Sequence, residues 1–472
     1  MIDLESFSRF STRTDRRCTL ICGRSGIGKT HQMAREGSRV ASAKQGQSRL
    51  GSSSHIAALV REEILEEFCR ELLGSLSRRD QRRWGWMYIR GLLVSDGRKS
   101  MRSIAATCRQ PASQQNLQQF VSNSTWQWME VRRRLARIIC GNLKVSSWVI
   151  SPLVIPKAGS NTVGVDTQFV SHLGRSVNCQ RALGIWLAQP GMSCPMDWHL
   201  VLPPSWTDDT FRRRSAAIPS DVKSGSPWGI GLDALVTIIN DWGLPVRPVV
   251  LDAREADAAE AIAELHRLRI PFIVRVNRAT RFTRTGWGEG RRHEETGQSA
   301  ESLARYLKEQ RRVVQWQDTE QSAHQGILAA AMHVDVPGAD TEPDPAPSPF
   351  TPVSTDLPPG RRAFVLIAEW RDSVQGRPSF WVSNLTRMSV PSLLACANLG
   401  RQVYRDQERI SRLVGLYDFE GRSFGGWHRH VTLVSAAHAF IVLNRLHTLL
   451  GETPRAGSAT TTRNAKSPWQ ET

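Results

Sequence analysis

The spacing of apolar residues changes once along this chain, and that change constrains the fold more than any other feature. From His55 onward, apolar residues recur at intervals of three and four, which is the period of one helix face. In the first such segment they are Ile56, Leu59, Val60, Ile64, Phe68 and Leu72. The same period predicts helices over 83–94, 101–108, 114–121 and 126–140. From Trp148 the pattern becomes short apolar or β-branched runs broken by Gly, Pro and Asn, which is typical of strands.

The region after Trp148 is predicted to form a mixed α/β sheet. Four short strands are expected over 148–156, 162–169, 181–188 and 198–202. They are followed by a helix over 229–242, a strand over 247–251 that leads into Asp252, a helix over 255–268 and a strand over 271–276. The remaining expected elements are strands over 363–369 and 379–383 and helices over 391–413 and 430–449. This succession of strands and helices favours an α/β fold.

The length of 472 residues exceeds one ordinary domain. Residues 1–54, rich in Ser, Arg and Gly, are expected to be a loosely structured extension, 55–145 a helical domain and 146–450 the α/β core. The run 335–361 is rich in Pro and Asp, cannot bury apolar surface and is predicted to be a flexible loop. The polar residues 451–472 are expected to form a disordered tail.

The chain is strongly basic, which indicates a polyanionic partner. Lys and Arg number 62 against 44 Asp and Glu, a formal net charge of +18, and nucleic acid is the commonest partner of such a chain. A membrane surface is the competing interpretation, but no apolar run reaches the ~20 residues that span a bilayer, and the start lacks a secretory signal. The eight cysteines form no CxxC pair, so neither disulfides nor structural zinc are indicated. His428 and His430 are expected to pack at a helix start rather than to bind a metal, and a cytoplasmic location is expected.

Residues Gly23–Thr30 read GRSGIGKT, a full match to the phosphate-loop pattern. Gly23 and Gly28 would let backbone N–H groups surround phosphates, Lys29 would supply positive charge and Thr30 would hold Mg²⁺. The helical block begins soon afterwards, however, and no second strand ending in Asp lies before it. A chance match or a remnant of fused sequence is therefore the favoured interpretation, and a nucleotide-binding switch is the alternative.

Several long motifs occur in the order that a known family has. The helical block contains YIRGLLVSDGRKSMRSIAA, and the first strands read WVISPLVIPKAGSNTVGVDTQFVSHLGRSVNCQ. The series continues with DWHLVLPPSWTDDTFRRRSAAIP, PVVLDA and GLYDFEGRSFGGWHRHVTL. Over about residues 60–450 the chain thus resembles DDE-type transposases of bacterial insertion sequences, the DDE superfamily endonuclease group. The resemblance implies an RNase H-like catalytic core with an all-helical N-terminal domain and an inserted β-rich subdomain at about 278–390.

The resemblance also implies a reaction, a cofactor and a partner. Enzymes of this group cut and rejoin insertion-sequence ends with Mg²⁺ ions that three carboxylates hold. Mg²⁺ is a hard cation that takes oxygen ligands, and anionic ligands offset its charge. The corresponding expectations for this chain are double-stranded DNA as partner, Mg²⁺ as cofactor, a homodimer as a candidate assembly and a nucleoid-associated location in the cytoplasm.

Only one of the three family carboxylates is matched here. The first falls on Ser151, the second on Asp252, and the third, counted back from the GLYDFEG motif, on Tyr404. A neutral hydroxyl does not replace the charge of a bridging carboxylate. We therefore expect a transposase-family DNA-binding protein with impaired catalysis. The alternative is an active enzyme in which Asp166 or Glu408 joins Asp252 in holding the metal.

Basic side chains are the expected DNA contacts. Some lie at matching motif positions and others in an arginine cluster of the helical block, for which a solvated helix face is an equal alternative. The residues are Lys157, Arg212, Arg213, Arg132 and Arg133. Contacts of this kind with phosphates would make binding salt-dependent without giving sequence choice.

Overall fold

The computed structural model describes residues 60–108, 113–255, 257–284, 297–317, 324–337, 364–371 and 376–449. The expected extension over 1–54 with its phosphate-loop motif, most of the loop 335–361 and the tail 451–472 lie outside this set. Within the described part of the chain, no helix is long and apolar enough to cross a membrane.

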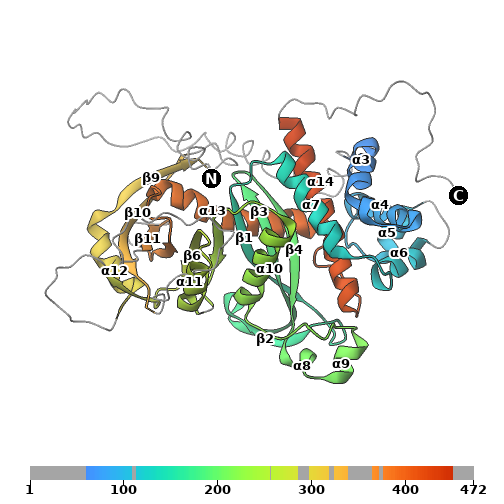
Figure 1. Cartoon of the computed structure of the whole chain (residues 1–472), viewed down its shortest axis with the longest axis horizontal. Coiled ribbons are helices and arrows are strands. Elements are labelled where there is room, and N and C mark those ends of the chain that lie inside the picture. Colours follow the sequence, from blue (N-terminus) through green and yellow to red (C-terminus); the bar gives the residue numbers. More distant parts are fainter. Residues whose placement is uncertain are drawn as a thin grey trace, which may run out of the picture.

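Among the described residues, five helices of the N-terminal part form one group with the last helix. They are α3 (Glu62–Leu72), α4 (Arg79–Val94), α5 (Met101–Ala106), α6 (Ser113–Ser122) and α7 (Trp128–Asn142), with a short 3-10 turn, η1 (Leu73–Ser75), after α3. The helix predicted from the apolar period is confirmed in α3, where the buried residues are Leu65, Phe68, Cys69 and Leu72. Helix α14 (Phe424–Leu449) lies against α4, α6 and α7, so the two ends of the described chain pack together (Figure 1).

A large mixed sheet forms the centre of the molecule. Strands β1 (Ser147–Pro156), β3 (Arg175–Gln189) and β4 (Met192–Val201) are antiparallel neighbours, and β2 (Asp166–Val170) also pairs with β3. On the other side of β1, strands β5 (Val249–Asp252) and β6 (Phe272–Val276) run parallel to it. The order β4-β3-β1-β5-β6 therefore joins three antiparallel strands to two parallel ones, as expected for a mixed α/β fold.

Beyond β6, strands from the segment expected as an insertion continue the same sheet. They are β12 (Ser379–Ser383), β11 (Phe364–Trp370), β10 (His324–Asp335), β9 (Arg312–Gln317), β7 (Arg281–Arg284) and β8 (Gln298–Ser299), and they lie at the left of Figure 1 with α12 (Ala300–Leu307) and the turn η3 (Lys308–Gln310). Because β12 pairs antiparallel with β6, this segment adds strands to the central sheet.

The remaining described elements are helices and turns. They are η2 (Ser171–Leu173), α8 (Pro204–Thr207), α9 (Thr210–Ser215), α10 (Pro227–Trp242), α11 (Ala258–Arg267), α13 (Val390–Asp406) and the π-helix η4 (Gln407–Ser411).

Two of these helices, α10 and α13, cover opposite faces of the sheet at β1. Side chains alternate along a strand, so Ser147 and Ile150 face opposite sides. Cys396 Sγ of α13 lies 3.0 Å from Ser147 Oγ. Gly231 of α10 packs so closely on the other face that an added Cβ would lie 2.8 Å from Ile150 Cγ2.

The helix expected over 391–413 is confirmed, because α13, η4 and the two residues that follow form one continuous helical segment that ends at Leu413. The wider π turn within this segment shifts the register of the side chains that follow it. The last helix differs from the expected one. Helix α14 begins at Phe424 rather than His430. Gly425 and Gly426 disfavour a helix by themselves. The Ser423 hydroxyl, however, accepts a hydrogen bond from the Gly426 N–H at 3.1 Å and caps this turn.

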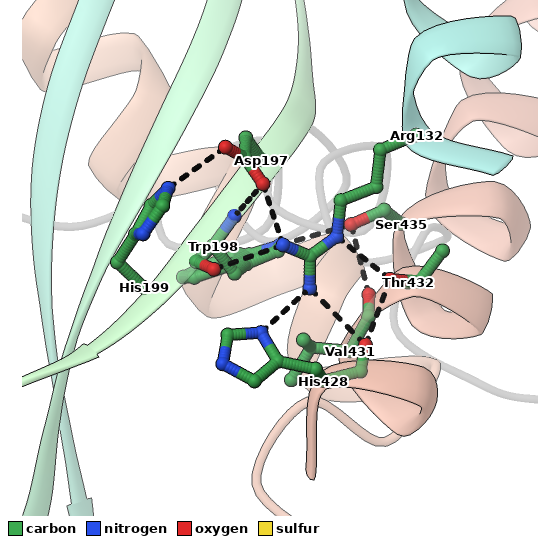
Figure 2. A network of polar contacts seen from close by, with 8 residues as sticks. All are labelled: Arg132, Asp197, Trp198, His199, His428, Val431, Thr432 and Ser435. Carbon is green, nitrogen blue, oxygen red and sulfur yellow. Dashed lines mark hydrogen bonds and ion pairs between the residues drawn. The ribbon is translucent and has the colours of Figure 1, made fainter. Parts of the chain in front are cut away.

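A buried ion pair joins the helical part to the sheet (Figure 2). Arg132 of α7 is fully buried, and its Nη1 donates to Asp197 Oδ1 of β4 at 2.5 Å and to the Trp198 carbonyl at 2.9 Å. Its Nε donates to Thr432 Oγ1 of α14 at 2.7 Å, and its Nη2 donates to the His428 carbonyl at 3.1 Å. One guanidinium therefore fixes three separate segments of the chain.

The structure corrects the expectation that Arg132 contacts DNA. The helix period places Arg132 on the inward face of α7, beside Val131, Leu135 and Ile139, which are also buried. A fully buried guanidinium has no access to a phosphate. Arg133 lies on the partly exposed side of the same helix.

Three histidines of α14, His428, His430 and His438, are buried, which confirms the packing role expected for the first two. His430 Nε2 donates to the Gly415 carbonyl at 2.9 Å, so its Nδ1 accepts from the Tyr88 hydroxyl at 2.9 Å. Burial lowers the pKa of His430 to about 4 and that of His438 to about 3. These imidazoles are therefore neutral hydrogen-bonding groups of the core.

Replacing Arg132 should destabilise the fold strongly. Arg132→Met leaves Asp197 buried without its guanidinium partner, which costs about 3–5 kcal/mol. Arg137→Met changes an exposed arginine of the same helix and should stay within about 0.5 kcal/mol of the wild type. Urea unfolding followed by circular dichroism measures both changes. Equal free energies of unfolding for the two variants would contradict the role of this ion pair.

Stability should fall as the pH drops from about 6.5 towards 4. An unfolded histidine has a pKa of about 6.5, whereas the pKa of His430 in the fold is about 4. The unfolded state therefore binds more protons within this window, and stability is lost as pH falls through it.

The histidine contribution can be measured by urea unfolding at several pH values across the window. His430→Gln removes the imidazole, so we expect a lower stability at neutral pH but a shallower loss on acidification. His333→Asn removes an exposed imidazole and serves as the control. An unchanged slope in His430→Gln would exclude His430 as a source of the acid sensitivity.

Candidate functional site

The first two family positions lie side by side on neighbouring strands. β1 and β5 are parallel, and their last paired residues are Ile150 and Leu251. Ser151 and Asp252 are the next residues on the two strands. Because side chains alternate, Ser151 lies on the same face of β1 as Ser147, which is the face that α13 covers. The fold therefore brings these two positions together at one edge, beneath one helix.

Asp252 is paired with arginines. The Arg254 side chain donates from Nε to Oδ1 at 2.9 Å and Oδ2 at 3.0 Å, and from Nη2 to Oδ2 at 2.8 Å. Arg275 of β6 lies 3.6 Å from Oδ2 through its Nη1. The hydrogen bonds from Arg254 to Asp252 raise the pKa of Arg254. Both carboxylate oxygens thus already have cationic partners.

The third family position does not face this edge. Tyr404 is 59% exposed on α13, so its side chain points away from the sheet. Asp406 is buried, but it accepts a hydrogen bond from Ser193 Oγ at 2.6 Å, at the start of β4. Gln407 is 2% exposed, and its Nε2 lies 3.4 Å from the carbonyl of Pro152, the residue after Ser151. A neutral amide therefore lies beside the first family position.

Sequence reasoning missed Gln407, although a signal was present. Gln407 follows Leu399 and Val403 at intervals of four, which is the period of the buried face of α13. Counting back from the GLYDFEG motif selected Tyr404 instead, which is exposed. The count assumes a regular helix, but the π-helix η4 lies between Tyr404 and the motif.

The two acids considered as relocated ligands lie elsewhere. Asp166 of β2 pairs with Cys179 of β3, whereas Ser151 pairs with Gly184, five residues further along that strand. Five residues of a strand span about 16 Å, beyond the reach of a shared metal. Glu408 is bound to Arg412 at 2.6 Å and accepts from the Tyr417 hydroxyl.

The donor set at this edge does not fit a pair of Mg²⁺ ions. A serine hydroxyl and a glutamine amide carry no charge, and the one carboxylate, Asp252, has two guanidinium partners. Within the part of the chain that the structure describes, no group of three His, Cys, Asp or Glu side chains could hold a metal ion. Two divalent ions need anionic oxygen ligands to offset their charge.

Several expected DNA contacts have roles inside the fold. Lys157 Nζ donates to the carbonyls of Phe419, at 2.5 Å, and Tyr417, and burial lowers its pKa to about 8. Arg213 donates to three backbone carbonyls around α9, those of Thr207, Pro219 and Val222. These two cations thus hold turns of the chain in place.

Arg212 and Arg133 remain accessible among the expected contacts. The Arg212 side chain is 41% exposed, and its guanidinium lies 5.3 Å from the ring centre of Trp206. Arg133 is half-buried. The phosphate-loop residues Gly23, Gly28, Lys29 and Thr30 lie outside the described residues, and nucleotide binding there stays a prediction.

Comparison with known proteins identifies the family of this chain. A family model described as DDE superfamily endonuclease matches residues 71–326, which is more than half of the chain and includes Ser151 and Asp252. No curated protein matches the sequence. The family implies an RNase H-like core and a DNA substrate, and the match covers the helices from α4 to α7 and the strands from β1 to β9. The chain therefore belongs to the DDE superfamily endonuclease family.

Proposed function

We propose that this protein binds double-stranded DNA and does not carry out the magnesium-dependent phosphodiester chemistry of its family. The observation that carries this proposal is the pairing of Asp252, the acid that matches a family carboxylate, with Arg254 and Arg275. A metal ion would have to displace a guanidinium that contacts both oxygens of this carboxylate. The insertion-sequence ends that related transposases recognise are the proposed DNA targets.

The neutral side chains at and beside the first family position support the same conclusion. Ser151 is 4% exposed and lies beneath α13, so its neutral hydroxyl offers one weak oxygen ligand. Gln407 has the length of a glutamate, but an amide oxygen lacks the negative charge that a divalent ion requires. One available carboxylate is too little to hold two divalent ions close together.

The charge of the molecule supports DNA binding in the absence of a metal. The formal net charge is +18. Arginines with exposed or half-exposed side chains occur on α7, on α9 and after β5, for example Arg137, Arg214 and Arg254. Such side chains bind phosphates and release counterions, so affinity follows the salt concentration rather than the base sequence.

We expect wild-type protein to bind a labelled DNA duplex equally well in Mg²⁺ and in EDTA at matched ionic strength. The affinity should fall linearly with salt on a double logarithmic plot, with a slope of about −0.9 for each neutralised phosphate. Fluorescence anisotropy measures this binding. Denaturing gels of the same samples should show an intact duplex.

The positive control for the gels is a magnesium-dependent nuclease added to a parallel sample. Magnesium-dependent cleavage by the purified protein that Asp252→Asn abolishes would overturn the proposal. Failure of the wild type to bind any duplex at low salt would also overturn it.

A further inference from the structure

Four arginines pair with Asp252 and Glu369 beside the edge that carries the first two family positions. We call Arg254, Arg275, Arg371 and Arg401 the arginine cluster; they come from the turn after β5, from β6, from the residue after β11 and from α13. Their carboxylate partners are Asp252 and Glu369. Among the described residues, these ion pairs join four guanidinium groups to two carboxylates, so cations outnumber anions within the cluster.

Glu369 holds the inner half of the cluster. Its carboxylate is 1% exposed and accepts from Arg401 Nη1 at 3.2 Å, Arg401 Nη2 at 2.7 Å, Trp381 Nε1 at 3.0 Å and Arg371 Nε. Burial alone would raise its pKa, but the hydrogen bonds and charge of Arg401 lower it, so the group is ionised. With these four donors, Glu369 has no free oxygen for a metal.

Arg275 and Arg401 are also held by an aromatic ring. Their guanidinium carbons lie 5.6 and 5.5 Å from the ring centre of Trp381. Arg275 Nη2 donates to Ser379 Oγ at 3.1 Å, while its Nε is buried and has no hydrogen-bond partner in the structure as described. The positions of these cations are therefore set before any ligand arrives.

Arg254 is the exposed member of the cluster. Its side chain is 51% exposed, against 22% for Arg275 and 24% for Arg401. Asp252 binds it through two oxygens, which fixes the plane of the guanidinium. A planar guanidinium offers several N–H donors at once and suits phosphate oxygens.

We propose that the arginine cluster binds a DNA phosphodiester directly, with Arg254 as the contacting residue and without a metal ion. This inference rests on the proposed function and assigns part of its DNA interface. Asp252 positions Arg254 and at the same time repels the phosphate, since both are anions. Removing the charge of Asp252 should therefore strengthen DNA binding, whereas in a metal-dependent active site it would remove a metal ligand.

The test compares two ion pairs of equal charge. Arg267 and Glu264 form a pair at 2.6 Å on α11, outside the arginine cluster. The variants Arg254→Ala and Arg267→Ala remove the same charge, as do Asp252→Asn and Glu264→Gln. Affinities for a labelled duplex are measured by anisotropy in EDTA, and circular dichroism checks that each variant is folded.

We expect Arg254→Ala to lower the affinity about tenfold, since it removes a charged hydrogen-bonding contact, and to reduce the salt slope by about 1. Arg254→Lys keeps the charge but loses the bidentate geometry, so its affinity should be intermediate. Asp252→Asn should raise the affinity roughly threefold, because it removes a negative charge close to the phosphate. The α11 variants should leave the affinity close to that of the wild type.

Three results would overturn the inference while leaving the proposed function intact, because the wild type would still bind DNA without cleaving it. They are equal effects of Arg254→Ala and Arg267→Ala, weaker binding by Asp252→Asn, and binding of inorganic phosphate that is lost in Arg254→Ala with DNA affinity unchanged. The last result would assign the cluster to a free phosphate ligand. A wild type that binds no DNA would instead refute the proposed function.

Discussion

The buried ion pair between Arg132 and Asp197 is the interaction on which the arrangement of the molecule depends. Burial alone would raise the pKa of Asp197, but the charges of His199 and Arg132 hold it well below its usual range. The donors of one planar guanidinium then fix the relative positions of α7, β4 and α14. Buried ion pairs add little net stability, but breaking one is costly. The pair therefore restricts how the helices sit on the sheet that carries Ser151 and Asp252.

Much of the fold was predictable because it follows local periods. The helices before Asn142 and the strands on either side of Asp252 follow from the spacing of apolar residues. The DNA contact predicted for Arg132 was wrong because composition does not distinguish a buried arginine from an exposed one. The helix period places Arg132 beside Val131 and Leu135 and so predicts its burial. The start of α14 was predicted too late because Gly425 and Gly426 disfavour a helix, whereas the hydroxyl of Ser423 caps the first turn and stabilises it.

The site was predictable only where strands define it. Ser151 and Asp252 lie on adjacent parallel strands, so matching each strand to a motif was enough to place them together. The helical position was harder, since counting along the chain assumes a regular helix and η4 is not one. Tyr404, selected by counting, is exposed, whereas Gln407 lies beside β1. The arginine cluster could not be foreseen, because its members come from four separate segments that only the sheet brings together.

Charge at this edge links the missing acids to the proposed mode of binding. Three carboxylates close together repel a DNA phosphate, and divalent cations held between them weaken this repulsion and supply the chemistry of the reaction. Ser151 and Gln407 are neutral, so Asp252 is the carboxylate left beside them, and it is paired with Arg254 and Arg275. The other arginines then give the edge a positive potential of its own. Under the proposals made here, the substitutions that remove the metal ligands also reduce the repulsion between this edge and a phosphate, so loss of catalysis and metal-independent DNA binding have one electrostatic cause.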